Sequence, residues 1–437
     1  MKALVIGAAR SGIAIAKLLK QNAYDVVLTD LKIVNEKLSL EDMGISVYDE
    51  GHPSSLLEQS YDLIIKNPGI PHTSPFVQAL SDQGYFIYNE IEIACRMVKY
   101  SIAAITGTNG KTTTTSLLEA MLKRKDERNL ACGNIGLAFS EVVAERGDVT
   151  LDVAMEIAAF QLLGCDRFKP KISVILNLAP DHLDVFGDVG AYYAAKCRIY
   201  QAQDENDVFL KNLDDENIVA LTQDVKARVL SFSLDKDADI HLENGWVKFK
   251  EEKLFEVSSL KITGMHNVSN AMVASSMAYL MGVELSDIQA VCAEFTGVEH
   301  RLEYITTIKG VRYYNDSKAT TAESTEVALK AFDSNIILLA GGYDKKTGFA
   351  ILKPHMHRLK AMYAFGVTRD QFKQLYPEAV LTETMEDALM QAYACAKEGD
   401  VVLLSPACAS YDQFDNYEQR GKMFKAFVHA LKAKAKE

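Results

Sequence analysis

The chain repeats one pattern along most of its length: a short apolar run, a tight turn and then a helix-like stretch. Examples are KALVIGAARSG at the start, YSIAAITGTNGKTTTTSLL in the middle and DVVLLSPACAS near the end. Strand-length runs that are apolar on both faces and alternate with helices indicate parallel sheets covered by helices on each side. The fold is therefore predicted to be α/β.

The 437 residues are too many for one ordinary domain. A strand-turn-helix opening starts afresh at residues 3–20, again at 101–122, and a third time after residue 298. Residues 205–260 instead alternate apolar and polar side chains around Asn-Gly and Asp turns, which predicts a small antiparallel patch in the middle region. The predicted domains are residues 1–93, 94–297 and 298–437.

Composition narrows the class of partner. The formal net charge is -12, which opposes the basic surface expected of a protein that binds nucleic acid or an anionic membrane. No apolar run approaches the roughly 18 residues of a membrane span, and the first residues lack the pattern of a signal peptide. The seven cysteines are widely spaced and include no CxxC pair, so we expect reduced, mostly buried thiols in a cytoplasmic protein.

The strongest local motif is the run Gly107, Thr108, Asn109, Gly110, Lys111, Thr112 and Thr113, between the apolar strand IAAI and a helical stretch. In that context backbone N–H groups and a helix N-terminus face phosphates, Lys111 adds a positive charge and Thr112 can ligate magnesium. The strict Walker pattern fails, since Ile105 stands where its first glycine belongs. Read alone, the motif could also be an ordinary turn and helix cap. Placed between this strand and this helix, it predicts a site for ATP or a related nucleotide.

Two further strands of the middle region end in polar groups, Glu156 after LDVAM and Asp181-His182 after KISVILNLAP. Ligands of open α/β sheets bind outside the carboxyl ends of the strands, so Glu156 and His182 are expected on the side of the phosphate loop as candidate magnesium ligands. Taken singly, each could equally be a solvated or helix-capping residue.

The blocks TGTNGKTTT, NLAPDHLD, YYAAKCRIY, GMHNVSNAMVA, EHRLE, YYNDSKATTAEST, LLAGGYDKK and LLSPACASYDQFDNYEQRG, in this order, resemble the Mur ligases. The resemblance implies a Rossmann-like N-terminal domain, a central P-loop ATPase-type domain and a Rossmann-like C-terminal domain. The last block, the NDSKAT block and the length point to the branch that adds D-glutamate to UDP-N-acetylmuramoyl-L-alanine with ATP, in peptidoglycan precursor synthesis. The resemblance further implies a monomer that binds no nucleic acid and no membrane.

The resemblance assigns the nucleotide and metal residues. Lys111 and Arg301 would bind the ATP phosphates, Asn270 the adenine and Asp316 the ribose. Thr112, Glu156 and His182 would serve two Mg²⁺ sites. Lys196 matches the lysine that the family carbamylates, which would make it an anionic metal ligand. Because CO₂ reacts only with a neutral amine, Lys196 should then have a lowered pKa; from spacing alone it is simply a helical lysine.

The other two substrates are assigned in the same way. D-Glutamate would contact Thr320, Lys345, Ser410 and Tyr417, with the catalytic Lys318 nearby. UDP-sugar would contact Arg10, Ser11, Asp30, Asn67 and Asn134. Arg10 and Ser11 belong to the sequence GAARSG, which follows the first strand. This is a dinucleotide-like turn in which Ala9 stands in place of the middle glycine. The segment 297–300 is expected to act as a hinge between domains.

The chain departs from the family pattern at three positions: Ala158 and Ala159 replace two serines, and Thr321 replaces an asparagine.

Three alternatives to the D-glutamate ligase are open at this point. One is another amino-acid-adding ligase of the superfamily, such as a folylpolyglutamate-type enzyme. Another is an NAD-dependent oxidoreductase built on the first turn, which leaves GTNGKT, DHLD and NDSKAT unexplained. The third is a nucleotide-binding relative that the two alanines have deprived of activity.

Overall fold

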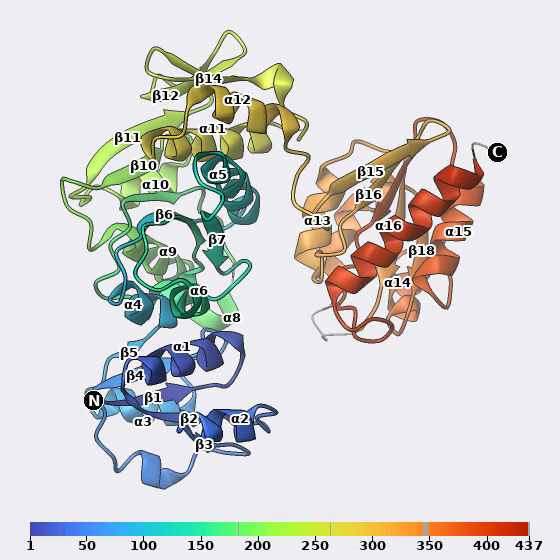
Figure 1. Cartoon of the computed structure of the whole chain (residues 1–437). Helices are drawn as coiled ribbons and strands as arrows, with labels where there is room; N and C mark the ends of the chain where they lie inside the picture. The colour runs from blue at the N-terminus through green and yellow to red at the C-terminus, as the bar shows by residue number, and fades with distance from the viewer. Residues whose placement is uncertain (182, 263, 344–347, 436–437) are drawn as a thin grey trace. The chain divides into compact units, whose positions relative to one another are not determined.

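The computed structural model describes residues 1–181, 183–262, 264–343 and 348–435. These form two compact units, Met1–Phe295 and Thr296–Glu437, which we describe separately. Within the described residues the chain folds into three sheets, two in the first unit and one in the second (Figure 1). The predicted α/β class is confirmed, because parallel strands covered by helices dominate every sheet.

The N-terminal sheet is wholly parallel, in the order β3-β2-β1-β4-β5. Its elements are β1 (Lys2–Ile6), α1 (Arg10–Gln21), β2 (Asp25–Thr29), α2 (Lys37–Asp42), β3 (Ser46–Tyr48), the 3₁₀ turn η1 (Ser54–Leu56), β4 (Leu63–Lys66), α3 (Pro75–Asp82) and β5 (Ile87–Tyr88). Ala3 and Val5 share a core with α1, whereas Leu4 and Ile6 share another with α3. Both faces of β1 are therefore buried, which is why its sequence is apolar throughout.

The central sheet has the order β14-β13-β12-β11-β10-β9-β6-β8-β7. Its strands are β6 (Ser101–Thr106), β7 (Leu130–Gly133), β8 (Asp152–Glu156), β9 (Ile172–Ile175), β10 (Val208–Asn212), β11 (Arg228–Ser233), β12 (Ile240–Glu243), β13 (Trp246–Phe249) and β14 (Glu252–Glu256). The helices are α4 (Glu90–Cys95), α5 (Lys111–Lys125), α6 (Phe139–Arg146), α7 (Ala159–Leu162), α8 (Leu183–Phe186), α9 (Val189–Cys197), η2 (Arg198–Tyr200), α10 (Glu216–Leu221), η3 (Val257–Ser259), α11 (Met265–Leu280) and α12 (Leu285–Glu294).

The antiparallel patch is smaller than residues 205–260. The antiparallel pairs are β12–β13 and β13–β14, while β10 and β11 extend the parallel sheet from β9. The short crossover helix α10 joins β10 to β11 and makes the parallel pairing possible. In β11, Arg228 and Val229 are exposed whereas Phe232 and Ser233 are buried, so its residues do not divide between one exposed and one buried face.

Helices cover both faces of the central sheet. Ala103 and Ile105 of β6 share a core with α5 and α11, whereas Ile102 and Ala104 share one with α6 and α9. The end of β6 thus lies between two helical layers, and the turn that follows it starts α5.

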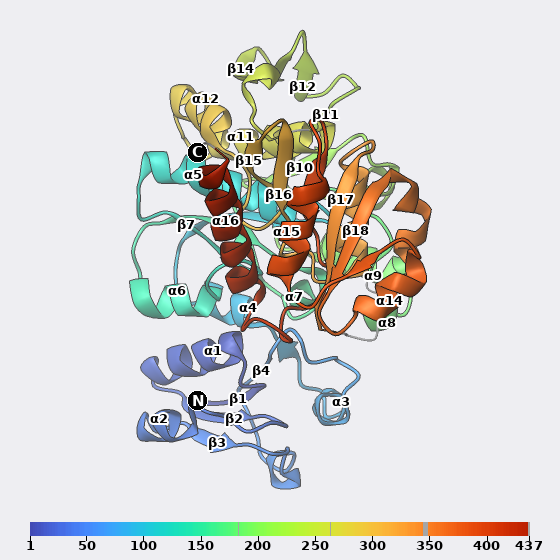
Figure 2. The same cartoon turned by 90° about the vertical axis from the view of Figure 1, so that its right-hand side faces the viewer.

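The second unit is built on the order β15-β16-β20-β17-β18-β19, parallel except for the β15–β16 pair. Its elements are β15 (Glu303–Ile308), β16 (Val311–Asn315), α13 (Ala322–Lys330), β17 (Ile336–Gly341), η4 (Ala350–Arg358), β18 (Leu359–Phe365), α14 (Arg369–Leu375), β19 (Val380–Leu381), α15 (Met385–Cys395), β20 (Val401–Leu404) and α16 (Tyr417–Lys434). Figure 2 shows α15 and α16 running along these strands, and they share a core with Ile337 and Leu339. Helices α13 and α14 share the opposite core with Ile336 and Leu338.

Two smaller expectations concern burial. None of the seven cysteines, all of which lie in the described part, forms a disulfide, and only Cys95 and Cys395 are partly exposed. In the described part of the chain, no helix is long and apolar enough to cross a membrane.

Candidate active site

The phosphate loop, residues 107–110, connects β6 to α5. Gly107 (φ +150°) and Gly110 (φ +83°) both have backbone conformations that favour glycine. A Cβ on Gly107 would lie 3.0 Å from the Cβ of Leu176, and one on Gly110 would lie 2.3 Å from Oδ1 of Asn270. Asn270, on α11, therefore lies directly against the loop. Both glycines are required by close approach as well as by their dihedral angles.

The segment after β9 braces this loop. The Asn177 side chain accepts a hydrogen bond from the Asn109 N–H (2.8 Å) and donates one to the Asn109 carbonyl (3.0 Å). The Asn177 carbonyl accepts from the Thr108 N–H, and the Thr108 hydroxyl exchanges two hydrogen bonds with the backbone of Ala179. The loop conformation is thus tied to the segment that leads to Asp181.

Two lysines meet at one carbonyl of the loop. The Nζ atoms of Lys111 and Lys196 each donate a hydrogen bond of 2.8 Å to the Gly107 oxygen. Lys196 is 1% exposed, and its Nζ lies 4.5 Å from the centroid of the Tyr192 ring. Burial, reinforced by the charge of Lys111 and opposed by that of Asp181, lowers the pKa of Lys196 to about 7. The expectation of a lowered pKa is confirmed, and much of this amine is neutral near pH 7.

Glu156 ends β8 at the same sheet edge, because its backbone pairs with Ile105 of β6. Its carboxylate is buried, and Oε1 accepts a hydrogen bond of 2.8 Å from Nδ2 of Asn134. Oε2 is also buried and has no hydrogen-bond partner among the described residues. A buried carboxylate oxygen without a donor is costly unless a ligand compensates it. The arrangement fits an oxygen-preferring cation such as Mg²⁺, and the Thr112 side chain at the start of α5 is buried as well.

His182 lies outside the described residues, as does Lys345 of the second unit. Their predicted roles remain predictions. Within the described part of the chain, no group of three or more His, Cys, Asp or Glu side chains forms a metal site.

The glycine turn of the N-terminal sheet gathers most of the residues predicted there. A Cβ on Gly12 would lie 1.9 Å from the Gly7 carbonyl oxygen, so only glycine allows α1 to start so close to the turn. Asp30 accepts hydrogen bonds from the N–H groups of Ala8 (2.6 Å) and Lys32 (2.8 Å). The Asn67 amide donates to the Ser11 hydroxyl at 3.0 Å. Ser11, Asp30 and Asn67 therefore lie around one turn at the carboxyl edge of the sheet.

Arg10 points elsewhere in the same unit. Its Nε lies 3.0 Å from Oε2 of Glu141, and its Nη1 donates to the Gly136 carbonyl at 2.9 Å. Arg10 thus joins α1 to the loop that carries Asn134, next to Glu156. The link is exposed and weak, since surface ion pairs contribute about 0–1 kcal/mol.

In the second unit, Arg301 lies between two non-glycine residues with left-handed backbone, His300 (φ +65°) and Leu302 (φ +42°). Asp316 is buried, and its carboxylate accepts hydrogen bonds from the Leu302 N–H (3.1 Å) and the Ser405 hydroxyl (2.7 Å). Burial raises the pKa of Asp316 to about 7, although the Ser405 hydrogen bond opposes the shift. The Arg301 turn is therefore fastened to the end of β16.

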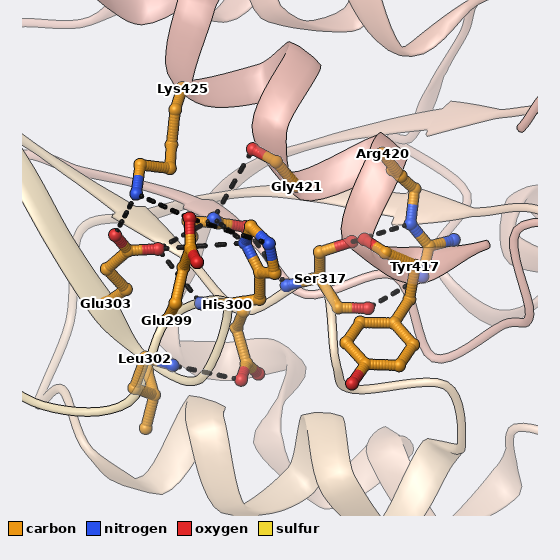
Figure 3. A network of polar contacts seen from close by, with 11 residues as sticks. Glu299, His300, Leu302, Glu303, Ser317, Tyr417, Arg420, Gly421 and Lys425 are labelled. Atoms are coloured by element: carbon orange, nitrogen blue, oxygen red, sulfur yellow. Dashed lines mark hydrogen bonds and ion pairs between the residues drawn. The ribbon is translucent and has the colours of Figure 1, made fainter. Parts of the chain in front are cut away.

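Thr320, Ser410 and Tyr417, three of the residues predicted for D-glutamate, lie in segments that Arg420 holds together. Arg420 is fully buried and donates to the hydroxyl and carbonyl oxygens of Ser317 (Figure 3). It also donates to the Cys408 carbonyl. The Ser317 hydroxyl donates in turn to the Tyr417 carbonyl at 2.8 Å. The segment of Lys318 and Thr320, the loop with Ser410 and the start of α16 are thereby joined at one edge of the sheet.

The three departures from the family pattern all lie at helix starts. Thr321 is the N-cap of α13 and its hydroxyl accepts a hydrogen bond from the Ser324 N–H, as an asparagine could. Ala158 and Ala159 are buried at the start of α7, where the Ala158 N–H donates to the Gln161 side chain at 2.9 Å. The Gln161 N–H, which a serine hydroxyl at position 158 could accept, donates instead to the Ala158 carbonyl at 3.0 Å.

Sequence reasoning missed three residues that organise these sites: Asn177, His300 and Arg420. All three lie inside the blocks that carry the resemblance. The best signal was Arg420, an arginine between the helix start NYEQ and a glycine, but its full burial could not be read from the sequence.

Comparison with known proteins identifies the family of the chain. The family model of the Mur ligase middle domain matches residues 105–278, and that of the Mur ligase glutamate ligase domain matches residues 300–408. The chain belongs to the Mur ligase family. A Geobacillus sp. (strain WCH70) protein named UDP-N-acetylmuramoylalanine--D-glutamate ligase is 40% identical, covering 99% of this chain and 98% of that protein. The protein of the same name from Bacillus cereus (strain G9842) is 41% identical, covering 98% and 97% respectively.

Solved structures show the same fold. UDP-N-acetylmuramate-alanine ligase MurC from Thermotoga maritima superposes with a TM-score of 0.59 at 20% identity, covering 99% of this chain and 100% of that one. The MurF ligase of Thermotoga maritima, solved in complex with ADP, has a TM-score of 0.59 at 17% identity and covers 92% and 95%. At such low identity these likenesses show the fold alone.

Proposed function

We propose that this protein is the ligase that joins D-glutamate to UDP-N-acetylmuramoyl-L-alanine at the expense of ATP, in peptidoglycan precursor synthesis. The observation that carries the proposal is the convergence of Lys111, Lys196 and the unpartnered oxygen of Glu156 at the edge of one sheet, around a glycine loop. Relatives of this name are about 40% identical over nearly the whole chain, which supports the choice of amino acid. We propose the cytoplasm as its location, because its nucleotide substrates are made in the cytoplasm. We also propose that it is a monomer.

The reaction must activate a carboxylate, which is a poor electrophile. An oxygen of the terminal alanine carboxylate attacks the γ-phosphorus of ATP, the bond to ADP breaks, and an acyl phosphate forms. The neutral amine of D-glutamate then attacks the acyl carbon, the C–N bond forms, and inorganic phosphate and a proton leave. Both steps concentrate negative charge, so preorganised cations and N–H donors supply most of the stabilisation.

In the first unit, the N–H groups of residues 107–113 and the start of α5 would bind the ATP phosphates, with Lys111 moving from the Gly107 carbonyl to a phosphate oxygen. Thr112, Glu156, His182 and a carbamylated Lys196 would hold Mg²⁺ in two sites, where the metal neutralises phosphate charge. Asn270 would contact the adenine. The largely neutral amine of Lys196 supports carbamylation, because CO₂ adds only to an unprotonated amine.

Ser11, Asp30 and Asn67 would bind the uridine nucleotide at the glycine turn, with Arg10 and Asn134 following toward the sugar. The first turn of α1 offers N–H groups for a diphosphate, as the dinucleotide-like sequence predicted.

In the second unit, Arg301, Lys318 and Asp316 would serve ATP and the acyl phosphate, and Thr320, Lys345, Ser410 and Tyr417 would bind D-glutamate. A small dianion requires several fixed donors, and Thr320, Ser410 and Tyr417 come from segments that Arg420 fastens together.

A second candidate is a relative that binds both nucleotides without turnover, which the alanines at positions 158 and 159 favour. One assay separates the two candidates. Phosphate release from MgATP is measured with UDP-N-acetylmuramoyl-L-alanine and either D-glutamate, L-glutamate or no amino acid. The ligase releases phosphate at a rate that depends on D-glutamate. Binding of both nucleotides without any release would favour the inactive relative, and turnover with another amino acid alone would identify another branch of the family.

A further inference from the structure

The turn that carries Arg301 is held in an unfavourable backbone conformation. His300 and Leu302 both have positive φ, a region that non-glycine residues rarely adopt. Such a conformation persists only where surrounding contacts impose it. Here the Glu303 carboxylate accepts the His300 N–H at 2.9 Å, and the Asp316 carboxylate accepts the Leu302 N–H at 3.1 Å. The direction of Arg301 is therefore set by its neighbours and not by local preference.

The ring of His300 is the centre of these contacts (Figure 3). The ring is 3% exposed, and its Nδ1 lies 2.8 Å from Nδ2 of Asn315. The Asn315 Oδ1 accepts a hydrogen bond from the Ser317 N–H, which fixes the orientation of the amide. Since the Asn315 Nδ2 is then a donor only, Nδ1 of His300 is the acceptor and the ring proton resides on Nε2.

The same ring rests on the backbone of α16. A Cβ on Gly421 would lie only 2.3 Å from Nδ1 of His300, so the ring occupies the space that the side chain of any other residue type at position 421 would need. Lys425, one helical turn further, pairs with Glu299 at 3.1 Å and with Glu303 at 2.5 Å. The His300 ring and the Tyr417 ring meet edge to face, 6.3 Å apart. These contacts fix the position of the Arg301 turn relative to helix α16, which begins with Tyr417.

The backbone of His300 reaches the third segment of the site. Its carbonyl accepts the N–H of Lys318 at 3.0 Å. One residue therefore contacts the turn of Arg301, the segment of Lys318 and helix α16.

We propose that His300 is a positioning residue, whose ring, accepting from Asn315 and seated on Gly421, keeps Arg301 in register with the start of α16. The inference deepens the proposed function and rests on it, because Arg301 is assigned to ATP and Tyr417 to the amino acid. One side chain then aligns the groups for two substrates. Displacing it should weaken both substrates together, although it touches neither.

Substitutions separate positioning from plain stability. His300→Ala removes the acceptor and the ring. His300→Asn keeps an acceptor close to the place of Nδ1 and belongs to the residue types that tolerate a left-handed backbone. His355→Ala is the matched control, since His355 lies in the same unit and its Nε2 is 3.0 Å from Oε1 of Glu326, a residue with no proposed role in substrate binding.

The readouts are the KM values for ATP and for D-glutamate, kcat, and thermal unfolding of each full-length variant. We expect His300→Ala to raise both KM values and to lower kcat/KM by about 100-fold, the effect of misplacing a site group by roughly 1 Å. His300→Asn should recover most of that loss, and His355→Ala should behave as the wild type. Unchanged KM values in His300→Ala, with kcat reduced only by the unfolded fraction, would overturn the inference. Equal losses in His300→Asn and His300→Ala would do so as well.

A crystal structure of His300→Ala gives a readout that is independent of activity. We expect positions 300 and 302 to leave their left-handed conformation and Arg301 to shift relative to α16. An unmoved turn would refute the positioning role. Wild-type protein that releases no phosphate would instead refute the proposed ligase function, while the displaced turn would still support the role of His300 in the architecture.

Discussion

Replacing Gly110 with alanine tests how tightly the phosphate loop is built. The backbone at Gly110 has φ +83°, and an L-residue there costs about 1–2 kcal/mol. The new Cβ would lie 2.3 Å from Oδ1 of Asn270, so one of the two groups must move by about 1 Å to restore van der Waals contact. Asn270 is buried and its amide donates to Asn267, which leaves the loop as the part that shifts. Misplacement by that amount should lower kcat/KM for ATP on the order of 100-fold.

Gly245 provides a matched control. It sits in the β12–β13 hairpin at φ +80°, and a Cβ there would meet no atom of the described residues within 4 Å. Gly245→Ala therefore imposes the same backbone strain without the collision. Both variants should lose about 1–2 kcal/mol of stability in thermal unfolding, but only Gly110→Ala should lose ATP turnover. Normal ATP kinetics in Gly110→Ala, or an equal kinetic loss in Gly245→Ala, would refute the reasoning.

Three further predictions concern the same sheet edge. Asn177→Ala removes two hydrogen bonds to Asn109, each worth about 1 kcal/mol, so the KM for ATP should rise roughly 30-fold while the melting temperature changes little; an unchanged KM would show that these hydrogen bonds are dispensable. Glu156→Gln removes the charge of the unpartnered carboxylate, and a Mg²⁺ titration of phosphate release should show kcat falling at least about 100-fold at any metal concentration; recovery in excess Mg²⁺ would reduce Glu156 to a metal-affinity role. Lys196→Met should abolish activity yet raise the melting temperature in CO₂-free buffer at pH 7.5. Between pH 7 and 10.5 the unfolded chain holds a proton on Lys196 that the folded protein lacks, so the stability of the wild type rises with pH across this window. The difference in melting temperature between the methionine variant and the wild type should therefore become smaller toward pH 10. A constant difference would contradict the burial argument.

The sequence correctly predicted those features of the fold that depend on residues close together in the chain. Apolar runs followed by glycine turns predicted the parallel sheets and the phosphate loop, because burial on both faces and the start of a helix leave clear marks in adjacent residues. The same reasoning failed for β10 and β11, which lie inside the sheet and pair in parallel, because the residues of a strand do not show in which direction its neighbour runs.

Long-range partners left no such mark. Asn177 braces a loop 68 residues earlier in the chain, and Arg420 bonds to Ser317 across 103 residues. The position of His300 on Gly421 depends on how β15, β16 and α16 pack. The loss of two serine hydroxyls at Ala158 and Ala159 was visible in the sequence, but only the structure shows that Gln161 satisfies the backbone donor at that point.

Transfer of an isotope tests the central claim most directly. UDP-N-acetylmuramoyl-L-alanine labelled with ¹⁸O in both oxygens of its terminal carboxylate is incubated with MgATP and D-glutamate, and the products are analysed by mass spectrometry. An acyl phosphate passes one carboxylate oxygen to phosphorus, so the account predicts one ¹⁸O atom in each phosphate released and one retained in the new amide carbonyl, in a product that has gained one glutamyl residue. Unlabelled phosphate, or phosphate formed without that product, would contradict it.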